Sequence, residues 1–396
     1  MAHPSIHPTL HTAPRPDVIV IGGGIIGSSI ALRLAQAGLR VEVFDRADPG
    51  AEASSAAAGM LAPQGEKTDS PSFTDLCWSS HSLYPEFVAE VEGLSGQQVG
   101  YRRDGSLMIA LDEDGARELD EIEADRSLSG PEKEAGATVE RLSPEAASRR
   151  VPGLAATIQG ALSLAADHWV DNRRLTAAVI EAARRKGAVF HAHAPITRLA
   201  ARAGRLEGIT QGGEQLSAGE FILAAGCWSG VLAASAGLDI PTVPCRGQMI
   251  EFELESELPQ VIRAGHHYLV PRAGRRALVG TTSEYAGFDK KVTAEGMASI
   301  LQPALDLAPF LAHARFVQTW AGLRPDTVDH LPVLGRSGIA GLTLATGHFR
   351  NGILLAPITA RLIAGLITAG SSPSALNPFR VNRFQTAEAL TEAARG

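Results

Sequence analysis

The chain has 396 residues, of which 45% are hydrophobic and 20% charged, and its formal net charge is −7. That length exceeds what a single hydrophobic core usually supports, so two domains are expected. An acidic balance without any basic run excludes a nucleic-acid-binding protein, because contacts with phosphates need clustered Lys and Arg.

The N-terminal residues and the cysteines indicate little chemistry. Residues 1–16 are rich in Pro and His. We expect a flexible leader here, because the prolines prevent a helix that would align the histidines as metal ligands. Cys77, Cys227 and Cys245 are scattered and lack CxxC spacing. This pattern predicts neither a disulfide framework nor a zinc site, and it fits a reducing cytoplasm.

A nucleotide-binding signature follows the leader. Residues 18–21 form an apolar run typical of a buried parallel strand. Gly22, Gly24 and Gly27 then have the G-x-G-x-x-G spacing. These glycines allow a tight turn, a close approach of backbone to a pyrophosphate, and close packing of the next helix. The order of strand, glycines and helix predicts the first half of a βαβ dinucleotide-binding unit.

The second half of that unit supplies an acidic residue. The strand predicted at 41–44 is followed by Asp45, which is placed to accept a hydrogen bond from an adenosine ribose hydroxyl. Arg46 beside it would suit a 2′-phosphate, but the carboxylate of Asp45 argues against NADP. A dinucleotide with an unmodified ribose is therefore expected.

Several further segments form a recognisable series. Residues 51–63, AEASSAAAGMLAP, are small enough for backbone to lie flat against a large group. Downstream come DHWVDNRRL (167–175), FILAAGCWSG (221–230), CRGQMIEF (245–252), HHYLVPR (266–272), WAGLRPDTVDHLPVLG (320–335) and GHFRNGILLAP (347–357). In this order, and over nearly the whole chain after residue 16, the series resembles the glycine oxidase and D-amino-acid oxidase branch of the FAD-dependent oxidoreductases.

The resemblance implies a non-covalent FAD. Some relatives attach the flavin through a C-terminal cysteine, but no cysteine follows Cys245 here, and Cys227 is interpreted as a small buried hydrophobic residue. The cofactor-binding residues expected are Gly22, Gly24, Ile25, Ile26, Gly27, Asp45, Arg46, Ser54, Ser55, Ala57, Ala58, Gly59, Met60, Ile196, Ala225, Gly226, Trp228, Gly347, His348, Arg350, Asn351, Gly352, Ile353 and Leu354.

The segment around Asn351 and Gly352 has its own physical interpretation. Apolar residues at helical spacing follow this pair, and Pro357 suits an early helical turn. A reduced flavin carries negative charge, which the free N–H groups at a helix N-terminus would stabilise. We therefore expect a helix that directs the N–H groups of about residues 351–354 at the flavin.

Two arginines and a tyrosine are the predicted substrate ligands. A guanidinium binds a carboxylate through two parallel hydrogen bonds, and Arg324 precedes a proline, which disfavours helix at that position. The resemblance implies that Arg324 and Tyr268 bind the substrate carboxylate and that Arg350 contacts substrate or adds positive charge near the flavin. The alternatives are solvent-exposed salt bridges for the arginines and a hairpin cap for Tyr268.

The resemblance also implies the reaction. A small amino acid with a neutral amine transfers hydride from Cα to flavin N5, the imine hydrolyses, and dioxygen reoxidises the flavin to give hydrogen peroxide. Orientation is sufficient for hydride transfer, so no histidine is assigned a catalytic role. Ser283 stands where glycine oxidases can carry a bulkier methionine. This departure predicts room for larger D-amino acids or N-methylglycine.

The expected fold class is α/β, with α+β character overall. A discontinuous Rossmann-like FAD-binding domain is predicted from residues 17–80, 155–228 and 318–396, and a mainly antiparallel substrate-binding domain from 81–154 and 229–317. Alternating runs around Gly-containing turns predict hairpins at 101–115 and 266–284, and helices are expected at 83–91 and 296–307.

The resemblance favours a cytoplasmic homo-oligomer, a homotetramer in relatives, that serves thiamine biosynthesis. Stable membrane insertion is not expected, because the apolar stretch 352–370 is interrupted by Pro357 and Arg361. The alternatives are a cyanide-forming glycine dehydrogenase subunit, a D-amino-acid dehydrogenase with another electron acceptor, and a flavin-binding module without turnover. The predicted substrate ligands argue against the last of these.

Overall fold

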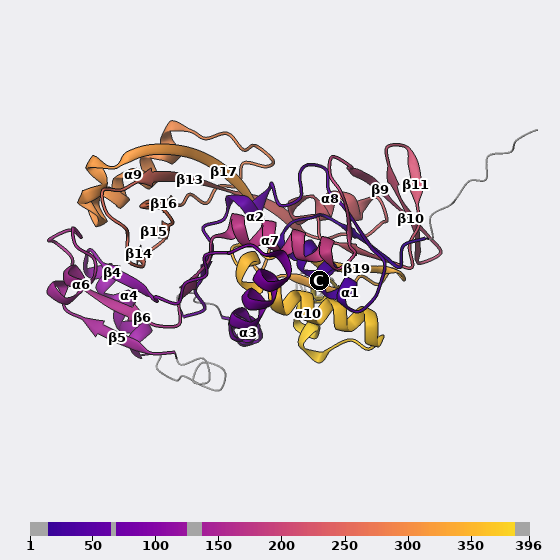
Figure 1. Ribbon diagram of the computed structural model, residues 1–396, viewed down its shortest axis with the longest axis horizontal. Coiled ribbons are helices and arrows are strands. Elements are labelled where there is room, and N and C mark those ends of the chain that lie inside the picture. Colours follow the sequence, from indigo (N-terminus) through magenta and orange to yellow (C-terminus); the bar gives the residue numbers. More distant parts are fainter. Residues whose placement is uncertain (1–14, 65–68, 125–136, 385–396) are drawn as a thin grey trace, which may run out of the picture.

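The computed structural model describes residues 15–64, 69–124 and 137–384, which form two lobes (Figure 1). Of the predicted leader, residues 1–14 lie outside the described residues.

The first lobe is built on a six-stranded sheet with the order β18-β19-β12-β1-β2-β8. From β19 to β8 neighbouring strands pair in parallel, and β18 pairs antiparallel with β19. The strands are β18 (Val333–Arg336), β19 (Leu342–Thr346), β12 (Glu220–Leu223), β1 (Val18–Ile21), β2 (Val41–Phe44) and β8 (Val189–His191). The two strands predicted around the glycine motif are confirmed with unchanged bounds. β1 is apolar and buried throughout, as a strand covered on both faces requires, and β2 departs from that pattern only at Glu42.

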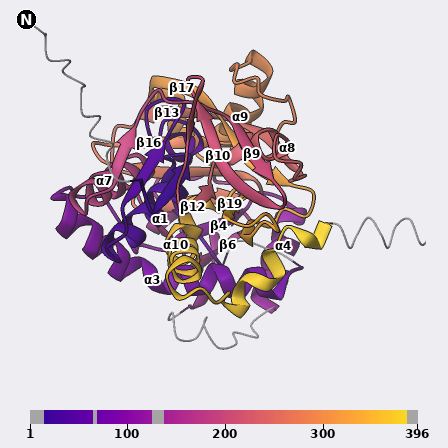
Figure 2. The same ribbon diagram turned by 90° about the vertical axis from the view of Figure 1, so that its right-hand side faces the viewer.

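Helices from distant parts of the chain share one core beside this sheet. They are α1 (Ile25–Gln36), α3 (Pro71–Ser95), α7 (Asn172–Arg185) and α10 (Gly352–Ala369). Figure 2 shows α1 beside α10 with α3 beyond them. The helix predicted at 83–91 lies within the C-terminal half of the longer helix α3. On the other face of the sheet lies a small antiparallel sheet of β9 (Ile196–Arg202), β10 (Arg205–Gln211) and β11 (Glu214–Leu216).

Pro357 lies inside α10, as its position in the apolar pattern allows. Proline has no N–H for the carbonyl four residues before it, so the Ile353 carbonyl needs another donor. The Tyr84 hydroxyl donates to it at 2.6 Å, and the Ser80 hydroxyl donates to the Leu354 carbonyl at 2.6 Å. α3 thus stabilises the first turns of α10.

α10 is long and apolar enough to cross a membrane by length and composition, and 61% of its most apolar window is buried inside the protein. Its packing against α1 and α3 accounts for that composition, because a helix that is apolar all round is typical of a core.

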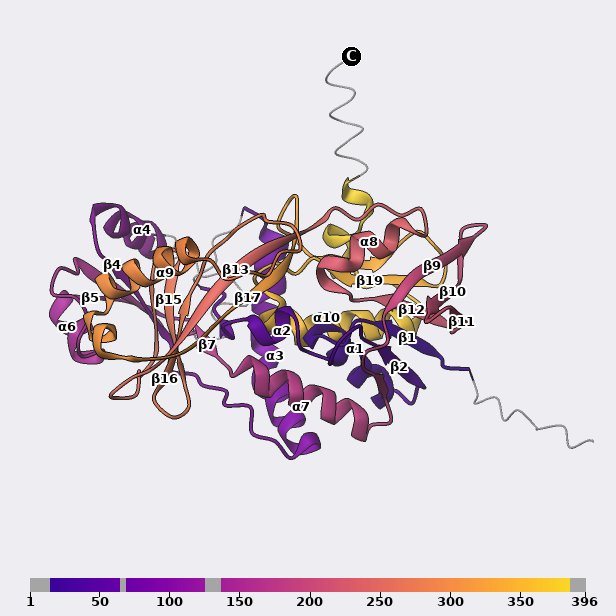
Figure 3. The same cartoon turned by 90° about the horizontal axis from the view of Figure 1, so that it is seen from above.

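The second lobe contains an eight-stranded, mainly antiparallel sheet with the order β17-β13-β16-β15-β14-β4-β6-β5. Its strands are β17 (Arg315–Thr327), β13 (Thr242–Glu253), β16 (Arg276–Gly280), β15 (His267–Arg272), β14 (Val261–Ala264), β4 (Ser106–Ala110), β6 (Gly160–Leu164) and β5 (Val139–Leu142). α9 (Ala294–Leu307) packs into its core, close to the helix predicted at 296–307. In Figure 3 the long strands β13 and β17 run from this lobe toward the first.

Of the two predicted hairpins, the one at 266–284 is confirmed as β15 and β16. The hairpin at 101–115 is wrong. β4 is followed by helix α4 (Glu113–Ala124), whose first turn is stabilised by Asp112 accepting from the Gly115 N–H at 2.8 Å. β4 pairs instead with β14 and β6, which lie far away in the sequence.

Sheet membership differs from the predicted domain boundaries at two strands. β6 and β17 belong to the eight-stranded sheet, whereas the sequence predicts residues 155–228 and 318–396 in the cofactor domain. In addition, α3 packs into the core of the first lobe, although the predicted substrate domain includes most of this helix. Alternating patterns identify strands but not their partners, so the division into domains stays a prediction.

Candidate active site

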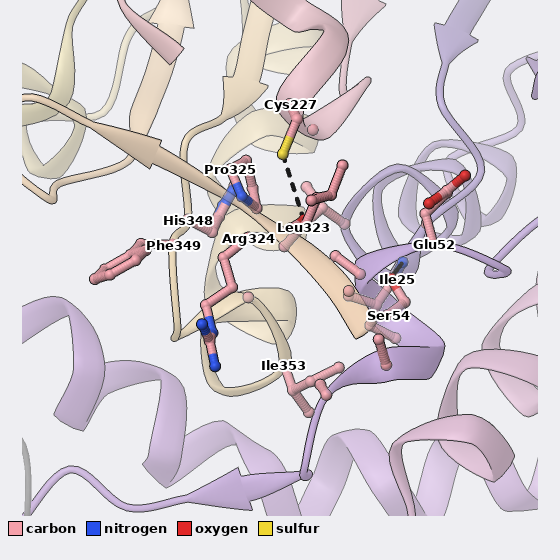
Figure 4. Close-up of a pocket in the computed structure, with 18 of the residues that line it drawn as sticks. Ile25, Glu52, Ser54, Cys227, Leu323, Arg324, Pro325, His348, Phe349 and Ile353 are labelled. Atoms are coloured by element: carbon pink, nitrogen blue, oxygen red, sulfur yellow. Dashed lines mark hydrogen bonds between the residues drawn. The ribbon is translucent and has the colours of Figure 1, made fainter. Parts of the chain in front are cut away.

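A cavity of about 690 Å³ is lined by residues of both lobes. Its walls come from the ends of β1, β2 and β12, the start of α1 and α10, α2 (Ala53–Ala56), and strands β13, β15 and β17. In Figure 4 Arg324 extends from β17 on one side, while Ile25 and Ser54 lie on the other. The cavity thus connects the glycine motif with the predicted substrate ligands.

The glycine turn at the end of β1 leaves no room for side chains. A Cβ on Gly22, whose φ is +106°, would collide with the Ala224 carbonyl, and one on Gly27 would collide with the Gly22 carbonyl. The first N–H of α1, at Ile25, donates to the Ser54 hydroxyl at 2.9 Å. The turn therefore brings bare backbone and a helix N-terminus to the cavity, as a pyrophosphate requires.

Asp45 stands at the carboxyl end of β2, beside that turn. Its carboxylate accepts hydrogen bonds from the N–H groups of Gly23 at 2.7 Å and Ala47 at 2.9 Å. Burial raises the pKa of Asp45. The carboxylate is held in a fixed orientation at the cavity wall, where the sequence predicts a ribose contact.

Arg46 is fixed at the same end of the cavity. Its guanidinium lies 3.6 Å from the ring centroid of Trp228 and pairs with Glu52 at 2.5 Å. Glu52 also forms an ion pair with Lys290 at 2.9 Å, and the ring centroids of Phe288 and Trp228 lie 5.4 Å apart. Trp228, predicted near the cofactor, is thus covered by a loop from the other lobe, and Glu52 is a member of the site that the sequence did not reveal.

The two residues that follow β16, Thr281 and Thr282, orient Arg324. Its Nη2 donates to the Thr281 hydroxyl at 2.9 Å, and its Nη1 donates to the Thr282 carbonyl at 3.1 Å. On β13, Arg324 pairs with Cys245, and a Cβ on Gly247, two residues further along that strand, would collide with the guanidinium. The predicted carboxylate ligand therefore lies in the cavity with its position fixed before any substrate arrives.

Tyr268 lines the same cavity from β15. Its hydroxyl lies 3.4 Å from Met249 Sδ, and a Cβ on Gly280 would lie 2.9 Å from its ring. Burial raises the pKa of Tyr268. The hydroxyl consequently stays protonated and can donate a hydrogen bond to a carboxylate.

The start of α10 also reaches the cavity, as predicted, through Asn351, Gly352 and Ile353. Arg350, just before them, is exposed, and its guanidinium lies 5.4 Å from the Phe349 ring centroid. Phe349 stacks in turn on His330 at 5.1 Å.

His348 is buried under this segment, with Nε2 3.1 Å from the Thr359 hydroxyl. Burial lowers the pKa of His348 to about 3 and that of His168 to about 3. Neither imidazole carries a charge near neutral pH.

These two histidines predict how stability depends on pH. Below the ordinary pKa of 6.5, the unfolded chain binds protons that the folded chain does not, so stability falls as pH decreases from 6.5 toward 3. When thermal unfolding is measured across this window, the melting temperature of His348→Asn should fall less with decreasing pH than that of the wild-type protein. Equal declines in both proteins would contradict the assignment.

Cys227 lies in the cavity wall, and its thiol donates to the Leu323 carbonyl at 3.3 Å (Figure 4). Burial raises the pKa of Cys227 to about 12. A thiol that stays protonated is a poor nucleophile, so Cys227 supports a non-covalent cofactor.

Most of the predicted site residues line this cavity, and four do not. Gly27 supports the turn from behind, and Leu354 belongs to the core. The Ser55 hydroxyl donates to the Ala51 carbonyl, and Gly347 packs against Thr327. Lining residues absent from the prediction include Glu52, Gly247, Arg263, His266, Thr281 and Thr282. Only Gly247 had a local signal, a glycine inside a strand pattern.

This combination defines a class of protein. A glycine turn with a following acidic residue opens onto the same cavity as an arginine and a tyrosine suited to a carboxylate, as in oxidoreductases that bring a dinucleotide to an acidic substrate. Among the described residues, no group of three or more His, Cys, Asp or Glu is arranged to hold a metal ion.

Comparison with known proteins agrees with this class. Residues 17–366 match the family DAO, FAD dependent oxidoreductase. A bifunctional protein ThiO/ThiG of Trichormus variabilis is 35% identical over 95% of this chain and 56% of its own length. The glycine oxidase of Geobacillus kaustophilus is 33% identical over 93% of this chain and 97% of its own. The chain thus spans about half the length of the bifunctional relatives and nearly all of the glycine oxidase.

Solved structures give the same result. The crystal structure of the Geobacillus kaustophilus glycine oxidase covers 93% of this chain and 99% of its own, with 32% identity and a TM-score of 0.86. The iminodiacetate oxidase of Chelativorans sp. BNC1 covers 92% and 98%, with 32% identity and a TM-score of 0.85. The chain belongs to the FAD-dependent oxidoreductase family that includes glycine oxidase, which confirms the predicted α/β fold and FAD as its cofactor.

Proposed function

We propose that the protein is an FAD-dependent oxidase of glycine and other small amino acids. It uses dioxygen and releases hydrogen peroxide and an imine. The imine hydrolyses to a 2-oxo acid and ammonia. The observation that carries the proposal is the single cavity that joins the glycine turn to Arg324 and Tyr268. The match to glycine oxidase over nearly the whole of both chains supports it.

The residues of the chain have distinct tasks in this reaction. Bound FAD supplies the hydride acceptor and passes the electrons to dioxygen. Arg324 holds the substrate carboxylate with an already oriented guanidinium, and the Tyr268 hydroxyl, which stays protonated, donates a hydrogen bond to the same group. Because burial lowers the pKa of His348 to about 3, its imidazole is too weak a base to take a proton from the substrate amine, and its Nε2 is engaged with Thr359. Fixing the substrate in place is the main contribution of the protein.

Substrates larger than glycine fit the proposal. Ser283 lines the cavity and is exposed, and its hydroxyl lies 3.2 Å from Cys245 Sγ. Its small side chain leaves space beside the carboxylate ligands. N-methylglycine, small D-amino acids and other N-substituted glycines are therefore included, and one relative oxidises iminodiacetate, an N-carboxymethyl glycine.

Filling that space should narrow the choice of substrate. We expect Ser283→Met to lower kcat/KM for D-proline at least about tenfold more than for glycine, since the loss of room for a few methylene groups has effects of this size. Peroxide release with both substrates measures the ratio, and Ser283→Ala is the control. An unchanged ratio would show that residue 283 does not limit substrate size.

The proposal extends to the cellular setting. Relatives named ThiO/ThiG support a role in thiamine biosynthesis. We place the enzyme in the cytoplasm as a homo-oligomer, a homotetramer by analogy with relatives.

The test is peroxide release by the purified holoenzyme with glycine, sarcosine, D-alanine, D-proline and iminodiacetate. Rapid peroxide formation with glycine or sarcosine supports the oxidase. Flavin reduction without peroxide would instead indicate a dehydrogenase with another electron acceptor. The absence of flavin reduction with every substrate would contradict amine oxidation.

A further inference from the structure

The segment 54–59 forms one wall of the cavity but has little means to hold its own shape. Its residues are SSAAAG, and five of them line the cavity: Ser54, Ala56, Ala57, Ala58 and Gly59. Helix α2 in this segment has only four residues. A single helical turn is unstable alone, and alanine and glycine offer no side chain that could anchor it. Other parts of the chain must therefore fix this backbone.

Four side chains from elsewhere hold the carbonyl groups of the segment. They come from the start of α7, from β15 and from β17. The hydrogen bonds are Asn172 Nδ2 to Ser54 O at 2.7 Å, Arg173 Nε to Ser55 O at 3.0 Å, Trp320 Nε1 to Ala56 O at 3.1 Å and Arg272 Nη2 to Ala58 O at 2.7 Å. None of these four described donors is among the residues that line the cavity. They therefore hold the segment from the side that faces away from the cavity.

The bond from Arg272 has the most direct effect on the cavity. In a planar trans peptide the carbonyl and the following N–H point in opposite directions. Because Arg272 holds the Ala58 carbonyl from behind, the N–H of Gly59 faces the cavity. Gly59 has φ +73°, a Cβ there would collide with the Val170 carbonyl, and its own carbonyl accepts from the Val170 N–H at 2.9 Å.

Arg272 is also well placed to link the two ligand sites. It lies on β15, the strand that carries Tyr268, and its Nη2 donates a second hydrogen bond to Asn172 Oδ1 at 2.9 Å. Burial lowers the pKa of Arg272 to about 10, so it stays charged at neutral pH. A guanidinium can serve several acceptors in a fixed geometry, which a lysine ammonium cannot.

We propose that Arg272 is a positioning residue for FAD, which holds the Ala58–Gly59 peptide with its N–H toward the cofactor and joins the tyrosine-bearing strand to the cofactor wall. The inference rests on the proposed function, because it assumes that FAD occupies this cavity.

The test compares Arg272→Met and Arg272→Lys with a matched control, Arg276→Met. Arg276 lies on the same hairpin and pairs with Glu251 at 3.2 Å instead of contacting the cofactor wall. FAD is titrated into each apoprotein to give Kd, and the visible spectrum of each holoenzyme is recorded with the KM for glycine. For Arg272→Met we expect an FAD Kd raised about tenfold or more, since a hydrogen bond from a charged group is lost, with a shifted flavin spectrum and KM within about twofold. Arg272→Lys should give an intermediate Kd, and Arg276→Met the wild-type values.

The outcomes separate this inference from the proposed function. A folded Arg272→Met variant with wild-type Kd and spectrum would overturn the role of Arg272 alone. If that variant does not fold, a wild-type Kd in Arg272→Lys would overturn it equally. A wild-type protein that binds no FAD would overturn the proposed function and this inference together.

Discussion

Arg324→Ala should lower kcat/KM for glycine about a hundredfold or more, mainly through a higher KM. Removing one partner of a buried, hydrogen-bonded charge pair commonly has effects of this size. Thr281 and Thr282 already hold the guanidinium, so the Arg324 side chain loses little conformational entropy when it binds the carboxylate. Steady-state peroxide release at varied glycine concentration measures the effect.

Two controls make that result specific. Arg324→Lys keeps the positive charge but cannot bind a carboxylate bidentately, so we expect it to retain only part of the activity that Arg324→Ala loses. Arg315→Ala removes an exposed arginine from the same strand and should leave KM unchanged. A wild-type KM in Arg324→Ala would mean that the carboxylate is bound elsewhere in the cavity.

Gly27→Ala should yield a protein that purifies with little or no flavin. The added Cβ would collide with the Gly22 carbonyl, which is backbone in the turn and has no flexible side chain to move aside. Relieving the overlap requires a shift of the turn or of α1, and either change disturbs the cofactor cradle. The ratio of flavin to protein in the visible spectrum and the FAD Kd of the apoprotein measure the loss.

Gly93→Ala is the matched control for this glycine. Gly93 lies inside α3, and its Cβ would meet nothing within 4 Å. We expect full flavin content and a gain of about 0.5–1 kcal/mol in the free energy of unfolding, the usual benefit of alanine over glycine in a helix. Stoichiometric flavin with an unchanged Kd in Gly27→Ala would show that the turn tolerates a side chain.

The parts of the fold that sequence predicted correctly are those encoded locally. β1, the glycine turn and β2 lie within one short stretch whose apolar runs and glycine spacing have a direct physical meaning. The start of α10 was predictable for the same reason, from an Asn-Gly pair before apolar residues at helical spacing. The two-residue periodicity of β15 and β16 around a glycine turn identified their hairpin.

The parts that sequence could not supply depend on pairing between distant segments. β4 was assigned to a hairpin because its pattern alternates, but its partners are β6 and β14. Glu52 and Lys290 meet across the two lobes, and no local pattern relates them. No local pattern distinguishes Arg272 from other arginines in strands, and only the fold shows that it donates a hydrogen bond to the Ala58 carbonyl.

The most direct test of the central claim is anaerobic mixing of the purified holoenzyme with excess glycine. We predict that the yellow flavin absorbance is bleached, and that admitting dioxygen restores it with about one hydrogen peroxide per flavin reduced, as the oxidase cycle requires. A flavin that stays yellow with glycine and with sarcosine, in a protein whose cavity holds FAD, would contradict the account.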